Sequence, residues 1–248
     1  MIVIKSKDEL LRMREAGRIV ADILALLKDK VVPGITTLEL DSIAERECRR
    51  RGAKPAFKGY GGFPFSICAS PEDRVVHGFP NDQPLVEGEI LSIDFGVVLK
   101  GFYGDSAVTL PVGAISAEKQ RLLDVTQEAL DLGIEQARVN NRLFDISHAI
   151  QSHVEKCGFS VVKEFVGHGI GRGLHEDPQV PNFGPPGQGP LLRSGMVLAI
   201  EPMINTGTAG VKVLGDGWTA VTLDRKPSAH FEHTVAITEE GPLILTAI

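Results

Sequence analysis

The stretch ILSIDFGVVLKGFYGDSAVTL, from Ile90 to Leu110, indicates a β-hairpin that carries two acidic residues. Two runs rich in β-branched and aromatic residues flank Leu99–Gly101. A chain reversal at Leu99-Lys100 would place Asp94 directly opposite Asp105, with Cβ atoms about 4.5–5.5 Å apart. Two carboxylates that close repel each other at neutral pH unless they share a proton or a metal ion. The alternative is two unrelated aspartates of a turn or a strand edge.

Three further residues, His168, Glu201 and Glu232, also place a polar side chain in a short apolar stretch. Glu201 follows an apolar run that begins at Val197, and Glu232 lies between Phe231 and another apolar run. Burying a carboxylate costs several kcal/mol unless something pairs with it. One such residue could form a buried salt bridge, whereas the whole set more readily converges on cations. The predicted ligands are Asp94, Asp105, His168, Glu201 and Glu232.

Composition narrows the class of protein. At 248 residues and 43% hydrophobic content, the chain can bury a large core. It has no apolar run of the roughly 18 residues that a membrane helix needs, and its beginning turns charged too soon for a secretory signal. Three cysteines, Cys48, Cys68 and Cys157, predict free thiols in the cytoplasm. A net charge of −6 argues against nucleic acid as the main partner.

Apolar periodicity predicts two helix–break–helix–strand units. The first unit has helices over about 7–30 and 36–51, the second capped by Thr36 and Glu39. The second unit has helices over about 116–137 and 145–157, separated by a break at Asn140-Asn141, with later strands around Val161, Val197, Val211, Trp218 and Thr234. We therefore expect a single catalytic domain, 1–248, with pseudo-duplicated halves of about 1–112 and 113–248 and the ligands between them.

Four motifs resemble those of the type I methionine aminopeptidases. They are GHGIGRGLHE at 167–176, the pair Ile93-Asp94 and Gly104-Asp105-Ser106, IEPM at 200–203 and FEHT at 231–234. The resemblance covers nearly the whole chain and implies an α+β, pita-bread fold: two pseudo-symmetric αβ halves around a curved antiparallel sheet. It also implies a metal-dependent hydrolase that removes the N-terminal methionine from polypeptides whose second residue is small.

The resemblance assigns a role to each candidate residue. Two divalent ions (Co, Mn, Fe or Zn) would be held, one by Asp94, the other by His168 and Glu201, with Asp105 and Glu232 bridging both. A metal-bridging hydroxide would attack the first peptide bond, with Glu201 moving the proton. The resemblance places His175 at the oxyanion and His77 near the scissile nitrogen. The implied substrate-binding residues are Tyr60, Phe63, Cys68, His77, His175 and Trp218, with Phe57 and Leu174 at the margin.

Phe57, Phe63 and Leu174 differ from residues common in relatives, so the shape of the methionine pocket stays open. His230 shares a strand face with Glu232 and should point toward the metals, although relatives commonly carry Gln there. His148, His153 and His233 should be structural.

The implied partners are the N-termini of nascent polypeptides at the ribosome, with no specificity for nucleic acid, no membrane and a monomeric chain. Two alternatives remain. A non-catalytic binding protein of this fold would lose ligands that this chain keeps. An X-Pro hydrolase would carry an extra N-terminal domain, and the stretch between His168 and Glu201 is too short for the insertion of type II enzymes.

Overall fold

The computed structural model describes residues 1–247, and all bounds and absences below refer to them. The α-helices are α1 (Lys7–Lys28), α2 (Thr37–Arg50), α3 (Ala117–Gln136) and α4 (Leu143–Lys156), with a 3₁₀ turn at Tyr60–Gly62. The strands of the first part are β1 (Lys54–Pro55), β2 (Cys68–Pro71), β3 (Arg74–Val76), β4 (Ile90–Leu99) and β5 (Phe102–Pro111). Those of the second part are β6 (Ser160–Val161), β7 (Gly167–Gly169), β8 (Glu176–Val180), β9 (Val197–Ile200), β10 (Met203–Asn205), β11 (Val211–Val213), β12 (Ala220–Thr222), β13 (Ser228–His230), β14 (His233–Thr238) and β15 (Gly241–Ile244).

Helix α2 begins where its predicted cap places it. The Thr36 hydroxyl accepts a hydrogen bond from the Glu39 backbone, and the Glu39 carboxylate accepts one from the Thr36 backbone, which confirms the capping box of α2. α4 begins at Leu143 and not at the predicted Asp145. The reason is that the Asp145 carboxylate accepts a hydrogen bond from the backbone N–H of Arg142, so Asp145 is already the third residue of the helix.

The β4–β5 hairpin turns one residue later than predicted. Lys100 and Gly101 form the turn, both with positive φ (50° and 81°), so Leu99 pairs with Phe102. Turns of this kind match the right-handed twist of the flanking strands. Asp94 is therefore opposite Ala107, and the prediction that it lies directly opposite Asp105 is wrong. Because the pairing moves by two residues, both aspartates still lie on one face, as diagonal neighbours.

Trp218 also departs from its predicted strand. It lies in a turn before β12, because the Asp216 carboxylate accepts hydrogen bonds from the backbone N–H groups of Trp218 and Thr219.

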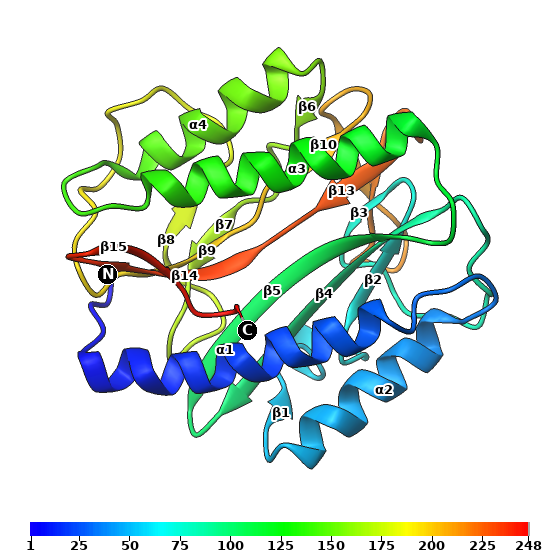
Figure 1. Ribbon diagram of the computed structural model, residues 1–248, viewed down its shortest axis with the longest axis horizontal. Helices are drawn as coiled ribbons and strands as arrows, with labels where there is room; N and C mark the ends of the chain where they lie inside the picture. Colours follow the sequence, from blue (N-terminus) through cyan, green and yellow to red (C-terminus); the bar gives the residue numbers. More distant parts are fainter. Residues whose placement is uncertain (248) are drawn as a thin grey trace.

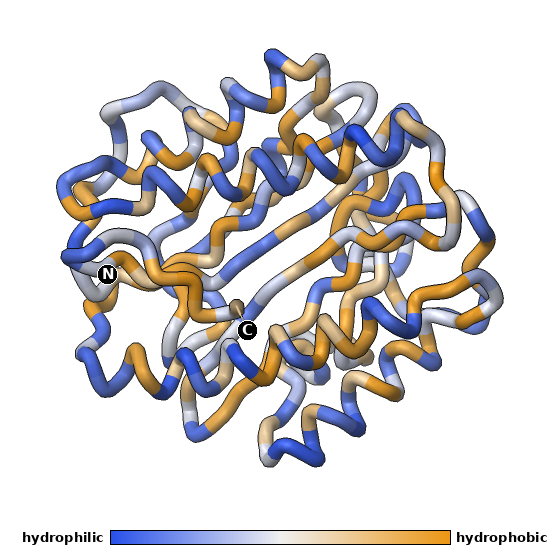
Figure 2. Tube along the Cα trace, viewed as in Figure 1, coloured by the Kyte–Doolittle hydropathy of each residue, from blue (hydrophilic) through white to orange (hydrophobic). Residues whose placement is uncertain are grey.

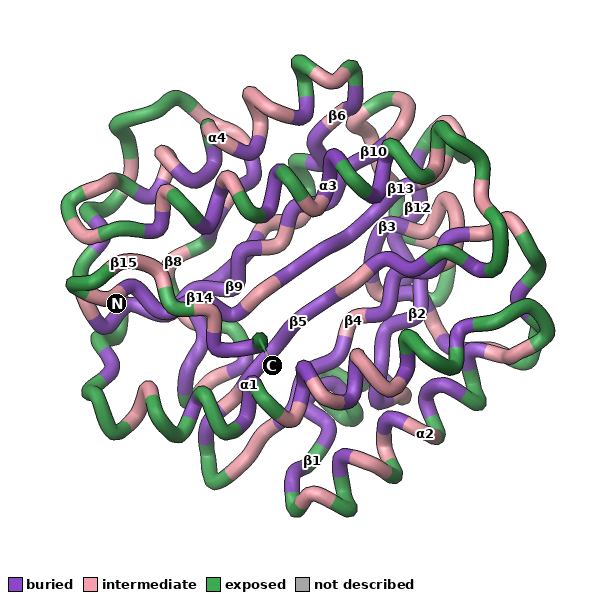
Figure 3. The backbone as a smooth tube through the Cα atoms, viewed as in Figure 1, coloured by how far each residue is buried: buried purple, intermediate pink, exposed green. Residues whose placement is uncertain are grey.

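All paired strands are antiparallel, in sheets ordered β1-β4-β2 with β5 beside β4, β13-β10-β6, β11-β12-β3 and β15-β14-β9-β7-β8. Figure 1 shows α1 and α2 on one side of the central strands and α3 and α4 on the other. Apolar residues recur along the helices (Figure 2), and the central strands are largely buried while the helices alternate between buried and exposed residues (Figure 3). The α+β class is as predicted. Within residues 1–247, no helix combines the length and apolarity needed to cross a membrane.

Two threonine side chains join β5 to the segment from β13 to β14. The Thr234 hydroxyl accepts from the backbone N–H of Asp105 (3.1 Å) and donates to the Asp105 carbonyl (2.7 Å). The Thr109 hydroxyl does the same at His230, at 2.8 Å for both bonds. Between these threonine clasps, the backbone N–H of Glu232 donates to the Ala107 carbonyl. The clasps therefore hold two segments far apart in the sequence side by side at the centre of the molecule.

Candidate metal centre and substrate pocket

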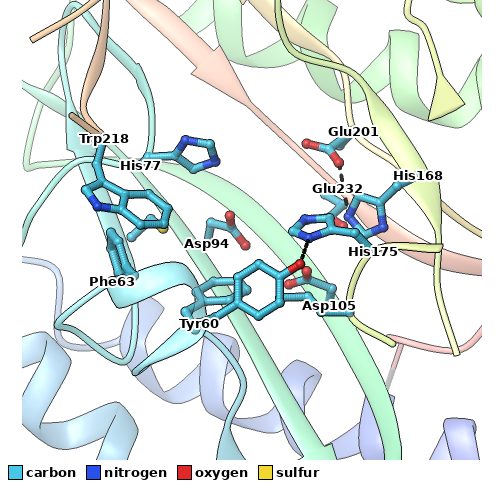
Figure 4. Close-up of a pocket in the computed structure, with 13 residues that line it drawn as sticks. Tyr60, Phe63, His77, Asp94, Asp105, His168, His175, Glu201, Trp218 and Glu232 are labelled. Atoms are coloured by element: carbon cyan, nitrogen blue, oxygen red, sulfur yellow. Dashed lines mark hydrogen bonds and ion pairs between the residues drawn. The ribbon is translucent and has the colours of Figure 1, made fainter. Parts of the chain in front are cut away.

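One pocket brings the predicted site residues together (Figure 4). Its space of about 600 Å³ is partly open to solvent, and it has an acidic end and an aromatic end. Its lining residues are Phe57, Tyr60, Phe63, Cys68, His77, Asp94, Asp105, His168, Leu174, His175, Glu201, Trp218 and Glu232.

The acidic end is built from the central strands. Asp94 and Asp105 come from the β4–β5 hairpin, and His168 comes from β7. Glu201 directly follows β9, and Glu232 lies between β13 and β14. Asp105, His168 and Glu232 each offer one ligating atom, and these atoms lie within 4.8 Å of one another. His168 Nε2 lies 3.5 Å from Glu201 Oε1.

Asp105 and Glu232 are buried, Asp94 and Glu201 are partly buried, and several of their buried oxygens lack partners. Asp94 Oδ1, Asp105 Oδ1 and Glu232 Oε1 have no hydrogen-bond partner among the described residues. Burial raises the pKa of Asp94 to about 7 and that of Glu201 to about 8. Burial, and then the neighbouring carboxylates, raise the pKa of Asp105 and Glu232 well above their usual range. Unpaired buried oxygens beside one imidazole fit a divalent cation, which would supply the missing positive charge.

His168 presents the nitrogen that such a cation needs. Its Nδ1 lies 2.9 Å from the carbonyl oxygen of Gly169, which can only accept, so Nδ1 carries the proton and Nε2 is free toward the carboxylates. Burial lowers the pKa of His168 to about 4, which keeps the ring neutral. His168 is therefore suited to ligate through Nε2.

His175 and His77 lie on either side of Asp94 in the view of Figure 4. The Tyr60 hydroxyl lies 2.8 Å from Nδ1 of His175, whose ring is 4.3 Å from that of His168, centroid to centroid. Burial lowers the pKa of His175, and that of His77 falls to about 4 for the same reason. His77 has a positive φ (59°), uncommon outside glycine, so the surrounding structure imposes its conformation. Both rings are neutral at pH 7 and face the same pocket.

The aromatic end is formed largely by Phe63 and Trp218, whose rings meet edge to face at 5.2 Å. Cys68 pairs with Asp94 across β2 and β4, and burial raises the pKa of its thiol well above its usual range, so it stays a neutral, polarizable group. Phe79 packs edge-on against Phe63. Phe79 does not line the pocket itself and supports Phe63 from outside it. This support could not be predicted from the sequence, because aromatic residues near turns give no signal that separates core from pocket.

His230 lies where the strand alternation predicts, on the side of the carboxylates. Its Nε2 is 3.5 Å from Glu201 Oε2 and has no hydrogen-bond partner among the described residues. His233 points the other way, with Nδ1 2.9 Å from the Thr246 hydroxyl. His148 and His153 lie on α4, outside the pocket.

Comparison with known proteins gives concordant relatives along the full chain. The profile described as metallopeptidase family M24 matches residues 11–239. The methionine aminopeptidase of Clostridium perfringens is 58% identical over 100% of both chains, and methionine aminopeptidase 1 of Bacillus subtilis is 56% identical over 100% of both.

Comparison with solved structures agrees with the sequence relatives. A methionine aminopeptidase from Thermotoga maritima is 47% identical and superposes with a TM-score of 0.99 over 100% of both chains. A prolidase from Pyrococcus furiosus has a TM-score of 0.80 at 22% identity, covering 99% of this chain and 66% of that one, and shares the fold alone.

Proposed function

This chain belongs to metallopeptidase family M24, with the pita-bread fold and the sequence of a type I methionine aminopeptidase, and we propose that the pocket described above is its active site. The activity of such a chain is the metal-dependent removal of the N-terminal methionine from polypeptides whose second residue is small. The single observation that carries the site assignment is a cluster of buried, unpaired carboxylates around His168, continuous with an aromatic pocket.

The family uses divalent metal, and the finer proposal is a pair of ions. Asp94 would hold one, His168 and Glu201 the other, and Asp105 and Glu232 both. Mn, Fe, Co and Zn all accept this set of oxygen and imidazole ligands. Bound in a pair, such ions act as Lewis acids toward a carbonyl and make water acidic enough to ionise near neutral pH.

The residues of the chain then have separate tasks. Glu201 receives a proton and returns it to the leaving amine, a task open to a carboxylate at the edge of the proposed metal pair. His175 donates a hydrogen bond to the carbonyl oxygen as negative charge develops on it. The Tyr60 hydroxyl supports this role: if it donates to Nδ1, the ring proton is on Nε2 and available to the substrate. His77 is proposed to contact the scissile nitrogen.

The aromatic end is proposed to bind the methionine side chain. Phe63, Trp218 and Tyr60 offer aromatic surface, and Cys68 offers a polarizable sulfur, both favourable contacts for a thioether. Specificity for methionine over charged or polar side chains follows, because a polar group in this end would lose its hydration without gaining a partner.

The substrates are N-termini of newly made polypeptides, a consequence of the activity. We further propose that the chain acts as a monomer, in the cytoplasm and at the ribosome. The cytoplasmic location rests on Cys48, Cys68 and Cys157, all of which are free thiols. We also propose one catalytic domain, residues 1–248, built from two pseudo-duplicated halves. The packing of α1 with β4 and β5, and of α3 with α4, supports this division.

Peptide cleavage by protein stripped of metal and then reconstituted tests the proposed function. Methionine should be released from Met-Ala-Ser only after a divalent cation is added back, while Ala-Pro peptides stay intact. Activity that survives chelation, or equal cleavage of Ala-Pro peptides, would contradict the proposal.

A further inference from the structure

A buried ion pair lies next to His175. Lys5 precedes α1, and its Nζ lies 2.7 Å from Oε2 of Glu176, the residue that follows His175. The side chains are 3% and 15% exposed, far less than in the surface ion pairs of this protein. Lys5 is fixed through its backbone as well, since its N–H donates to the Gly195 carbonyl at 2.8 Å.

The second oxygen of Glu176 orders the loop that leads to His175. Oε1 accepts hydrogen bonds from the backbone N–H groups of Arg172 (2.8 Å) and Gly173 (2.9 Å). Both oxygens of the Glu176 carboxylate are thus engaged. One contacts Lys5, and the other accepts from the two loop amides. A carboxylate that accepts charge-assisted bonds of this kind is held in one orientation.

The loop is shaped to let the Lys5 side chain through. A Cβ on Gly171 would lie 2.4 Å from Cε of Lys5, so any larger residue there would displace the Lys5 side chain. The Gly171 carbonyl in turn accepts a hydrogen bond from the Tyr103 backbone of β5, at 2.9 Å. The Lys5 side chain, Gly171 and the two loop amides therefore pack together around Glu176. Glu176 is the residue directly after His175.

We propose that Lys5 is a positioning residue for His175, acting through Glu176 and the loop 171–175. The proposal rests on the proposed function, in which His175 stabilises the oxyanion. The Tyr60 hydroxyl contacts the ring of His175 (Figure 4), and the ion pair of Lys5 and Glu176 holds the backbone at the next residue. Lys5, in the segment before α1, therefore sets the geometry of His175, although Lys5 and Glu176 are 171 residues apart in the sequence.

The test is Lys5→Met, which keeps much of the side-chain volume and removes the charge. We expect kcat to fall by about 10- to 100-fold, the scale for losing support behind a catalytic group, with KM and metal content little changed. Lys119→Met is the matched control, since it breaks a partly buried Lys–Glu pair (Nζ to Oε1 of Glu72, 2.6 Å) remote from the pocket, and its kcat should equal that of the parent.

A double-variant cycle separates positioning from general destabilisation. In a His175→Ala background, Lys5→Met should change kcat by less than about threefold, because its effect passes through His175. The same loss in both backgrounds, or a parental kcat for Lys5→Met, would overturn the inference. If Lys5→Met does not fold, as judged by circular dichroism, Glu176→Gln replaces it, since the amide oxygen can still accept from the loop while the ion pair is lost.

Failure of the inference and failure of the proposed function give different results. A parental kcat for His175→Ala would refute the role assigned to His175 itself. A reduced kcat for His175→Ala together with a parental kcat for Lys5→Met would refute only the positioning role of Lys5.

Discussion

Removing metal should make the stability of this protein fall as the pH rises above neutrality. The cause is the group of buried carboxylates, whose pKa values burial raises, to about 7 for Asp94 and about 8 for Glu201. A carboxyl with a higher pKa in the folded state binds more protons folded than unfolded. Its stabilising contribution is therefore present at low pH and is lost as the pH rises through the folded-state pKa.

His77 and His168 change the stability of the protein over a lower range of pH. Burial lowers the pKa of His77 and His168 to about 4, so the unfolded chain binds more protons than the folded one between that value and the ordinary histidine pKa. They make stability rise with pH mainly below about 6.5, and each adds only about 0.4 kcal/mol more between about pH 6.5 and 8.5. Over the range from about pH 6.5 to 8.5 the carboxylates therefore dominate.

The size of the effect follows from the two printed values. At about 1.4 kcal/mol per pH unit and proton, Asp94 removes about 1 kcal/mol and Glu201 about 2 kcal/mol over this range. Asp105 and Glu232, whose pKa values burial also raises, add to this loss. A loss of about 3 kcal/mol lowers the unfolding midpoint of a chain of this length by roughly 6–12 °C.

Thermal unfolding followed by circular dichroism, in chelator and at stepped pH, measures this directly. Glu201→Gln should remove about 2 kcal/mol of the pH dependence, whereas Glu239→Gln, at an exposed position, should leave it unchanged. Added divalent cation should stabilise more at high pH, because binding needs the ionised carboxylates. A midpoint that is constant or rises from about pH 6.5 to 8.5 in chelator would refute the reasoning.

Three further outcomes are expected. Asp105→Ala or Glu232→Ala should lose metal at both positions and Asp94→Ala mainly at one, since only the first two are proposed to bridge; equal, full occupancy by elemental analysis would remove the bridging assignment. In a Met-X-Ser series, methionine should be released when X is Gly, Ala, Ser, Thr, Val, Pro or Cys and retained when X is Arg, Lys or Trp; similar rates for Met-Ala-Ser and Met-Trp-Ser contradict this. His175→Ala should lower kcat by about 10²–10³ with metal content unchanged, whereas His168→Ala should lose metal; parental turnover for the first, or half its metal, counts against its role as donor.

Much of the fold follows from local sequence signals. The caps at Thr36 and Ser116 place the starts of α2 and α3, and apolar periodicity gives the helical faces. β7 has no such signal. It consists of Gly167, His168 and Gly169, and its strand conformation depends on pairing with β8 and β9. A Cβ on Gly169 would lie 2.1 Å from the Asp177 carbonyl, so close backbone packing selects these glycines and not strand propensity.

The members of the site were easier to predict than its geometry. A charged residue in an apolar stretch is visible in sequence, which is why Glu201 and Glu232 could be named before they were seen in one pocket. The relation of Asp94 to Asp105 was not visible, since a turn shifted by one residue changes the pairing by two. The threonine clasps at Thr109 and Thr234 could not be predicted from the sequence, because each joins segments that only the tertiary fold brings together.

The order of the ligands along the chain has a consequence for biosynthesis. Asp94 and Asp105 belong to one hairpin and can come together soon after they leave the ribosome, because their contacts are local. Glu232 is the last of the five to be made, and the Thr234 clasp that joins its segment to Asp105 needs residues made later still. We therefore expect a growing copy of this enzyme to gain its full set of ligands only near the end of its own synthesis. An unfinished copy would then be unable to trim the other chains that emerge around it.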